Sequence, residues 1–143
     1  MSSFSIHERK LLIRSFYDNF WSRGDASLAK AIFSQDVIIC DVAADWPQGV
    51  EGVLALAATW RAGFPDMNER ALVLTAEGDH VLAFFEFTGT HLGPYQGILP
   101  TGKTITMLGA DCFKFVGDKV SEWSFIEDRL SLFSALGARL STR

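Results

Sequence analysis

The chain has 143 residues, the size of one domain with a single hydrophobic core. Its composition, 48% hydrophobic and 21% charged, excludes an intrinsically disordered protein. The net charge is −4 and Lys and Arg form no cluster, which makes nucleic acid and anionic membranes poor partners. No apolar run approaches the roughly 20 residues that span a bilayer, and residues 1–5 lack the regions of a signal peptide. We therefore expect one cytoplasmic domain over residues 1–143.

The first part of the chain carries the patterns of three helices and one strand. Ser5 and Glu8 have the Ser-x-x-Glu spacing of a capping box, and the apolar rows that follow predict a helix over about residues 6–22. Further along we expect a short helix with Leu28, Ile32 and Phe33, a β-branched strand over residues 36–42, and a third helix over about residues 53–62.

The remaining chain reads mainly as strands. Residues 70–76 and 81–88 flank a turn containing Gly78-Asp79, and residues 104–116 and 120–127 flank Gly117-Asp118. A closing helix is expected over residues 130–136, with Asp128 as its N-cap. Helices followed by an antiparallel meander predict an α+β fold.

Asp111 is the residue that fits its surroundings least well. Strand side chains alternate between faces, so Asp111 shares a face with Phe113 and Phe115, while Lys114 on the other face must reach water. Asp111 is therefore expected to point inward. A carboxyl in an apolar interior tends to stay protonated and can act as a general acid or hydrogen-bond donor. The alternative is a structural acid satisfied by backbone groups or water.

The sequence predicts no metal site and no cofactor. Cys40 and Cys112 lie in apolar strand-like runs, which favours buried free thiols over a disulfide. The three histidines lack the spacing of paired metal ligands. Neither a Gly-rich phosphate loop nor a Gly-x-Ser-x-Gly elbow occurs.

Several motifs, in this order and spacing, carry a resemblance to a known family. They are Gly-Thr-His-Leu-Gly at 89–93, Gly-Ile-Leu-Pro-Thr-Gly-Lys at 97–103, Ala-Asp-Cys-Phe-Lys-Phe at 110–115, Lys-Val-Ser-Glu-Trp at 119–123, Asp128, and Leu136-Gly137. The chain resembles the SnoaL-like polyketide cyclase (ester cyclase) group of the NTF2-like superfamily. The resemblance implies a cone in which a curved, mostly antiparallel sheet wraps around the N-terminal helices and encloses an apolar pocket.

The resemblance also implies site residues, with one departure from the cyclase pattern. The catalytic aspartate of the cyclases lies on the last strand, where this chain has Phe125, and their accompanying histidine corresponds to Asp111. Ketosteroid isomerase, a relative within the superfamily, is similar at three positions. It implies Tyr17 and a protonated Asp111 as hydrogen-bond donors to an enolate oxygen, and Asp41 as the general base. The implied activity is cofactor-independent cyclisation or isomerisation of a hydrophobic polyketide-, terpenoid- or steroid-like carbonyl compound.

Other residues are assigned to the same pocket. The match to relatives aims Trp123, Phe125 and Glu127 inward, which makes Glu127 a second acid at the pocket mouth. His91 follows Phe85 and Phe87 at even spacing; it either enters the pocket for proton transfer or is a loop histidine bound to backbone. The expected substrate-binding residues are Trp46, Trp60, Phe64, Phe85, Phe87, Phe113, Trp123 and Phe125.

Two other activities compete with the cyclase or isomerase. One is a non-catalytic NTF2-like domain that binds a small molecule or a partner; it would show carboxylates held in structural hydrogen bonds and no open cavity. The other is an epoxide hydrolase, which needs an arginine two residues before Asp111, where this chain has Gly109.

One face of the long predicted strands is only partly polar. It carries Ala110, Cys112, Ser124 and Ile126 among charged residues. Such a face is usually covered, and relatives pair through this side of the sheet. We therefore expect a homodimer formed through the outer sheet face.

Overall fold

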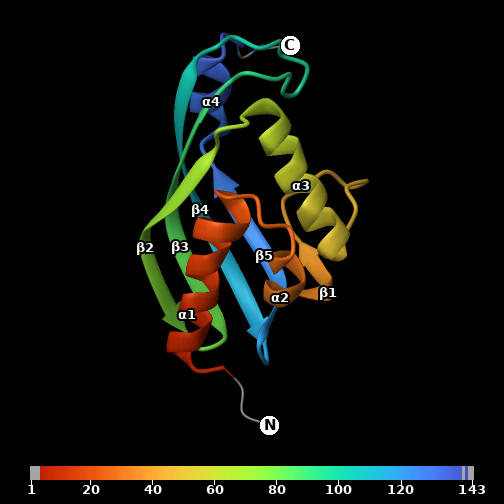
Figure 1. The fold of residues 1–143 in the computed structure, drawn as a ribbon, viewed down its shortest axis with the longest axis vertical. Coiled ribbons are helices and arrows are strands. Elements are labelled where there is room, and N and C mark those ends of the chain that lie inside the picture. The colour runs from red at the N-terminus through yellow and green to blue at the C-terminus, as the bar shows by residue number, and fades with distance from the viewer. Residues whose placement is uncertain (1–3, 140, 142–143) are drawn as a thin grey trace.

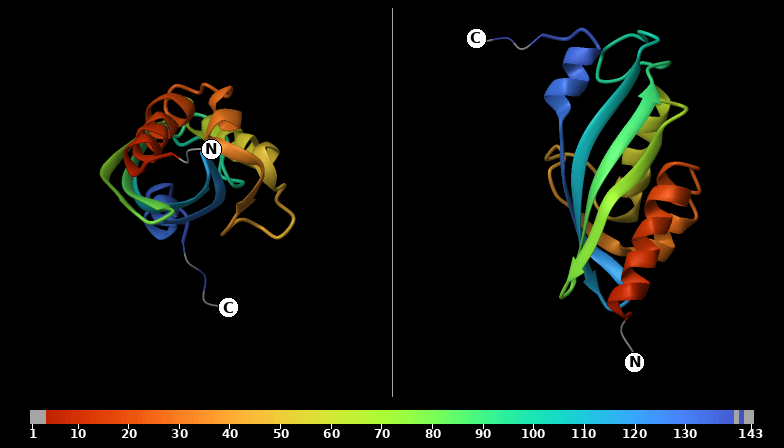
Figure 2. Two further views of the ribbon diagram at one scale, coloured as in Figure 1. Left: turned by 90° about the horizontal axis from the view of Figure 1, so that it is seen from below. Right: turned by 90° about the vertical axis from the view of Figure 1, so that its left-hand side faces the viewer.

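The computed structural model describes residues 4–139 and 141 and shows the expected α+β fold. Its five strands form one curved sheet in the order β1-β5-β4-β3-β2, and the N-terminal helices lie along the concave side (Figures 1 and 2). The strands are β1 (Phe33–Ile39), β2 (Asn68–Glu77), β3 (His80–Thr90), β4 (Thr104–Val116) and β5 (Lys119–Glu127).

The first helical segment changes its winding halfway along. The α-helix α1 (Ile6–Ser15) starts with the predicted capping box, in which Ser5 and Glu8 bond to each other's backbone N–H. It continues as a π-helix, η1 (Phe16–Trp21), in which the Ser22 N–H reaches the Tyr17 carbonyl five residues back. The wider turn places four aromatic side chains in the interior, namely Phe16, Tyr17, Phe20 and Trp21. A helix over residues 6–22 is confirmed in extent, but its second half is not α-helical.

The other helices lie close to their predicted positions. Helix α2 (Leu28–Ile32) is short, and α3 (Gly49–Gly63) begins four residues before the expected start at residue 53. Helix α4 (Arg129–Ala135) is capped as predicted, because the Asp128 carboxylate accepts the Ser131 N–H at 3.1 Å. No helix in the described part of the chain is both long and apolar enough to cross a bilayer.

Strand β1 differs from its prediction in position. It covers Phe33–Ile39 rather than residues 36–42, and Phe33 belongs to the strand rather than to the preceding helix. It ends early because Asp41 has a positive φ of 67°, which an extended strand cannot contain. β1 pairs in parallel with β5, whereas the other neighbouring strands are antiparallel, so the sheet is mixed.

Side chains along β4 alternate between the inner and outer faces of the sheet, and this alternation places Asp111 in the interior. Asp111, Phe113 and Phe115 are buried on the inner face, and Lys114 is exposed on the outer one, as predicted. The expectation of buried thiols is wrong: Cys112 lies on the outer face and Cys40 just beyond β1, and both are free and half-buried.

Candidate functional site

Asp111 is buried at the centre of the sheet's inner face, with 3% of its surface exposed. The Tyr17 hydroxyl donates to Oδ2 at 2.5 Å, and the Trp123 indole N–H donates to Oδ1 at 2.9 Å. The three residues come from η1, β4 and β5, so the fold brings together side chains far apart in sequence. The predicted partnership of Tyr17 and Asp111 therefore exists as a direct contact.

The charge of Asp111 depends on two opposing effects on its pKa, burial and hydrogen bonding. Burial raises the pKa of the Asp111 carboxyl to about 7, and the nearby Glu127 carboxyl raises it too. The bonds from Tyr17 and Trp123 act in the opposite direction, because they stabilise the anion. Burial and the adjacent Asp111 also raise the pKa of Tyr17, so the phenol keeps its proton. The pair can hold or release one proton near neutral pH.

Glu69 is a buried carboxyl that the sequence analysis did not identify. It lies on β2 opposite Phe87 of β3, facing inward with 5% of its surface exposed. Burial raises its pKa well above the ordinary value, and the Asp111 and Glu127 carboxyls add to the shift. The one available signal was its even spacing from Ala71 on the inner face, since the predicted strand began only at residue 70.

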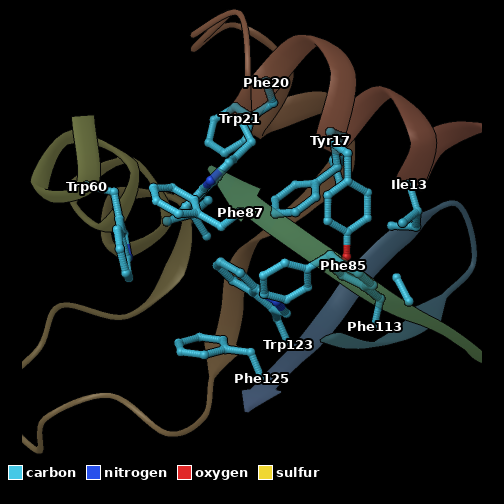
Figure 3. Packing of buried hydrophobic residues seen from close by; sticks show 14 of the residues in the cluster. Ile13, Tyr17, Phe20, Trp21, Trp60, Phe85, Phe87, Phe113, Trp123 and Phe125 are labelled. Atoms are coloured by element: carbon cyan, nitrogen blue, oxygen red, sulfur yellow. The ribbon is translucent and has the colours of Figure 1, made fainter. Parts of the chain in front are cut away.

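Aromatic side chains surround these carboxyls. Figure 3 shows Tyr17, Phe85, Phe87, Phe113, Trp123 and Phe125 converging on one interior. The rings of Phe113 and Trp123 stack at 6.2 Å with an interplanar angle of 7°, and Trp123 contacts Phe125 at 4.9 Å. All the side chains expected as walls on β3, β4 and β5 are buried there.

A second aromatic group lies where α3 meets the loop after β3. Trp60 packs against Phe87 and Tyr95, with ring centroids 4.9 Å apart in each case, and Phe64 lies 5.4 Å from the His91 ring. Both Trp60 and Phe64 are buried. Trp46 is half-buried, and its indole N–H donates to the Gly52 carbonyl at the start of α3. Trp46 therefore anchors the loop before α3.

His91 is fully buried and bound to its own loop. Its Nδ1 accepts the backbone N–H of Thr101 at 3.2 Å and lies 3.0 Å from the Thr101 hydroxyl. That arrangement leaves the hydrogen of a neutral ring on Nε2, which has no hydrogen-bond partner among the described residues. The contacts of Nδ1 are those of a loop histidine bound to backbone, and a role for His91 in proton transfer stays a prediction.

The remaining predicted acids lie at the margins of the interior. The Glu127 side chain is 9% exposed and pairs with Arg129 at 3.1 Å; burial raises its pKa while Arg129 lowers it. Asp41 is exposed beyond the end of β1, and its Oδ2 accepts the Phe125 N–H at 3.4 Å. Asp41 is therefore farther from the apolar interior than expected of a buried base.

Glycine at position 109 is required by packing. A Cβ there would lie 2.3 Å from Cζ of Phe85. The arginine of an epoxide hydrolase has no room at this point. Among the described residues, no three His, Cys, Asp or Glu side chains group in a way that could hold a metal ion.

The structure has hollows near the site but outside the carboxyl cluster. One of about 180 Å³ lies between the η1–α2 turn and α3, lined by Phe20, Gly24, Ala26, Leu54, Ala57, Ala58 and Arg61. Phe20, one of its lining residues, also belongs to the interior aromatic cluster. A larger one of about 400 Å³ lies over α4.

Solved structures with the same fold include some that are named as candidate polyketide cyclases. TsrD from Streptomyces laurentii superposes with a TM-score of 0.88 at 22% identity, covering 95% of this chain and 99% of that one. A candidate polyketide cyclase from Acidithiobacillus ferrooxidans is 29% identical, with a TM-score of 0.81 and coverage of 96% and 98%. AclR from Streptomyces galilaeus, a candidate hydroxylase, is 26% identical, with a TM-score of 0.82 and coverage of 97% and 87%.

No curated protein matches the chain. The family model of the SnoaL-like polyketide cyclases, however, matches residues 11–136. This span runs from α1 through α4 and includes the buried carboxyls Glu69, Asp111 and Glu127. The chain belongs to the SnoaL-like polyketide cyclase family.

Proposed function

We propose that this protein is a cofactor-independent cyclase or isomerase that acts by acid–base chemistry on a hydrophobic carbonyl compound. The observation that carries the proposal is the buried Asp111, bonded to Tyr17 and Trp123 and surrounded by aromatic rings, with a pKa of about 7. A carboxyl that exchanges its proton near neutral pH in an apolar interior suits this chemistry. Family membership supports the same class of reaction.

The reaction begins when a carboxylate removes a proton from the carbon next to the substrate carbonyl. The electron pair of that C–H bond forms a carbon–carbon double bond, and the carbonyl π pair moves to oxygen. The Asp111–Tyr17 pair neutralises this oxygen by donating a hydrogen bond or the Asp111 proton. Asp41 is the sequence-based candidate for the proton acceptor. Returning the proton to another carbon gives an isomer, whereas attack of the enolate on a second carbonyl of the same molecule closes a ring.

Exchange of carbon-bound hydrogen tests this proposal without the natural substrate. We would measure deuterium uptake at C1 of 2-tetralone, a fused aromatic ketone, by NMR in D₂O. Wild-type protein is expected to accelerate uptake over buffer. Asp111→Ala and Tyr17→Phe should each reduce that acceleration by roughly 10²-fold, the scale of losing one donor to a developing oxyanion. Asp111→Asn keeps a donor and should retain much of it. No acceleration by wild-type protein counts against the proposal.

A non-catalytic binding domain is the second candidate, and one observation favours it. Both Asp111 oxygens already accept hydrogen bonds from the protein, as expected for a structural acid. Such a domain would bind 2-naphthol, which has the shape of the enol of 2-tetralone, in the same interior. It would not accelerate deuterium uptake. Measuring 2-naphthol binding and 2-tetralone exchange on the same protein preparation therefore separates the two candidates.

We also propose that the protein forms a homodimer through the outer face of its sheet. Leu82, Phe84, Leu108 and Ile126 are exposed on neighbouring positions of β3, β4 and β5. Ile126 is 77% exposed, and a hollow of about 300 Å³ runs beside it. A contiguous apolar face of this kind is normally covered in solution, and a second copy of the chain offers the same face.

A further inference from the structure

We propose that Glu69 is the carboxyl that takes up the substrate's carbon-bound proton. This assignment rests on the acid–base function proposed above and replaces Asp41 in that role. It follows from three features of the interior: the free oxygens of Glu69, an unpaired donor on the adjacent element η1, and the contacts that fix the Glu69 backbone.

Glu69 differs from the other acids in what its oxygens contact. Both oxygens of Asp111 accept protein hydrogen bonds, and one oxygen of Glu127 is bonded to Arg129. Within the described residues, the Glu69 carboxyl accepts none; burial and neighbouring carboxyls alone account for its pKa. A proton acceptor needs a free lone pair directed at the substrate. Glu69 is the buried acid whose oxygens accept no protein hydrogen bond among the described residues, so its lone pairs are available.

Trp21 supplies a second, independent sign of a missing ligand. Its side chain is 4% exposed, and its indole N–H has no partner among the described residues. Figure 3 shows the Trp21 side chain among the aromatic residues of the interior, and its ring packs against Trp123, which donates to Asp111. Buried donors and acceptors in a folded protein are rarely left without partners. A polar group of a bound molecule would satisfy this unpaired donor.

The backbone of Glu69 is fixed to the residue that follows Trp21. The Ser22 hydroxyl accepts the Glu69 N–H at 2.9 Å and donates to the Glu69 carbonyl at 3.1 Å. This double contact ties β2 to the end of η1. It holds the unpaired carboxyl and the unpaired indole on adjacent elements, facing the same interior. A substrate reaching both would lie beside the Tyr17–Asp111 pair, since the Asp111 carboxyl raises the pKa of Glu69.

In this scheme Glu69 and the Asp111–Tyr17 pair have complementary tasks. Because burial and the neighbouring carboxyls raise the pKa of Glu69, its proton must first leave to solvent, and the ionised fraction grows as the pH rises. The Glu69 carboxylate then takes the carbon-bound proton, the C–H pair becomes the enolate double bond, and the oxygen is neutralised by the Asp111–Tyr17 pair. Glu69 then returns its proton to another carbon, giving the isomer, or to the alkoxide formed on ring closure. Either product is an isomer of the substrate, so no oxidant, reductant or co-reactant is needed. The pKa of Glu69 is raised first by burial and then by the Asp111 and Glu127 carboxyls.

The test compares matched carboxamide variants in the 2-tetralone exchange assay and in 2-naphthol binding. Glu69→Gln should bind 2-naphthol like wild-type protein but lower the exchange rate by 10²-fold or more. Glu77→Gln, the same change at the exposed end of β2, is the control and should alter neither. Glu69→Asp, which keeps a carboxylate on a shorter side chain, should recover part of the exchange and guards against a folding defect in the first variant.

The outcomes separate this inference from the proposed function. If Asp41→Asn loses exchange and Glu69→Gln keeps it, while Asp111→Ala is inactive, the function stands and Glu69 is not the base. Wild-type protein without exchange, or Asp111→Ala and Tyr17→Phe with full exchange, overturns the function itself. Loss of 2-naphthol binding together with exchange in Glu69→Gln assigns Glu69 to binding and contradicts its role as the base.

Discussion

Asp111 illustrates how an acid can be held between two protonation states. Two donors favour its anion, yet its pKa rises to about 7 because burial removes more hydration than the two bonds replace. Desolvation therefore prevails in this site. The same balance leads to two predictions at the scale of single residues.

The first prediction is that Asp111→Asn changes how stability depends on pH. An unfolded Asp titrates near pH 3.9, whereas folded Asp111 titrates near 7. Between these values the unfolded chain loses its proton first, so the free energy of unfolding of the wild type falls as pH rises from about 4 to about 7. The shift corresponds to a few kcal/mol, on the order of 1.4 per pKa unit. In Asp111→Asn the free energy of unfolding should not show this decrease with pH.

Denaturant unfolding at about pH 4 and about pH 8 measures the effect. Asp118→Asn, a substitution at an exposed turn, should show the same difference in the free energy of unfolding between the two pH values as the wild type. At pH 7 Asp111→Asn should be as stable as the wild type or more so. A loss of several kcal/mol, as expected for breaking a buried ionic network, would instead make Asp111 a structural anion.

The second prediction is that Tyr17→Phe raises the pKa of Asp111 above about 7. The Tyr17 hydroxyl stabilises the Asp111 anion, so its removal favours the protonated acid. The carboxyl carbon shift of Asp111 in ¹³C NMR across a pH titration reports this. Tyr95→Phe removes another buried hydroxyl that does not contact Asp111 and should leave the midpoint in place. A midpoint that falls in Tyr17→Phe would contradict this account.

The inward orientation of Asp111 could be predicted from the sequence, whereas that of Glu69 could not, because the strands differ in regularity. Alternation is strict along β4, so the outward Lys114 fixed the inward Asp111. Along β2 the register shifts between Ala71 and Val73, which breaks the alternation just after Glu69. A bulge depends on the partner strand, and the local pattern of one strand does not reveal it.

At the scale of elements, Arg9 connects the N-terminal part of α1 to the sheet. Arg9 is buried and donates to the carbonyls of Gly78 and Gly117, which belong to the two hairpin turns β2–β3 and β4–β5. Its guanidinium also lies 5.2 Å from the centre of the Phe115 ring. Arg9 thus ties one helix to both turns at the same end of the sheet.

We therefore predict that Arg9→Leu destabilises the fold by about 2–3 kcal/mol, the range of a charged group's hydrogen bonds. The two turn carbonyls would lose their donor, and Asp79 would lose its ion pair. Urea unfolding followed by far-UV circular dichroism measures this. Arg14→Leu, on the exposed side of α1, should change stability by less than about 0.5 kcal/mol. Equal effects of both substitutions would mean that Arg9 acts only through its bulk.

Element order and caps could be predicted, whereas helix type and strand ends could not. The caps at Ser5 and Asp128 depend on a few adjacent residues, and both are present. The π-helical winding of η1 depends on how Phe16, Tyr17, Phe20 and Trp21 pack inside the cone. The early end of β1 depends on the positive φ of Asp41, and the β-branched residues before it gave no sign of this.

At the scale of the molecule, the outer sheet face contrasts with the aromatic interior. The interior is aromatic and packed, while the opposite face leaves Phe84 and Ile126 in contact with solvent. Along β3, β4 and β5, each residue that points into the interior is followed by one that points to the outer face, so the two faces are built from the same strands. A partner on the outer face would cover what the fold itself does not.

We predict a dimer by light scattering at micromolar concentration, and a monomer after Ile126→Glu. A glutamate at the centre of a twofold interface would face its own copy, and the like charges would repel. Leu130→Glu adds the same charge at an exposed position on α4 and serves as the control. A wild-type protein that is monomeric under these conditions would refute the dimer.

The parallel pairing of β1 with β5 has a consequence for how the chain folds as it is made. Ile39 lies opposite Trp123, so β1 must wait for the last strand before it acquires a neighbour. The hairpins of β2, β3 and β4 join segments close in sequence and can form during synthesis, whereas this closure links distant segments and carries a larger entropic cost. A ribosome that stalls before β5 would therefore hold a nascent chain in which β1, with Phe33, Val37 and Ile39, has no strand partner, a state in which apolar surface is available to chaperones.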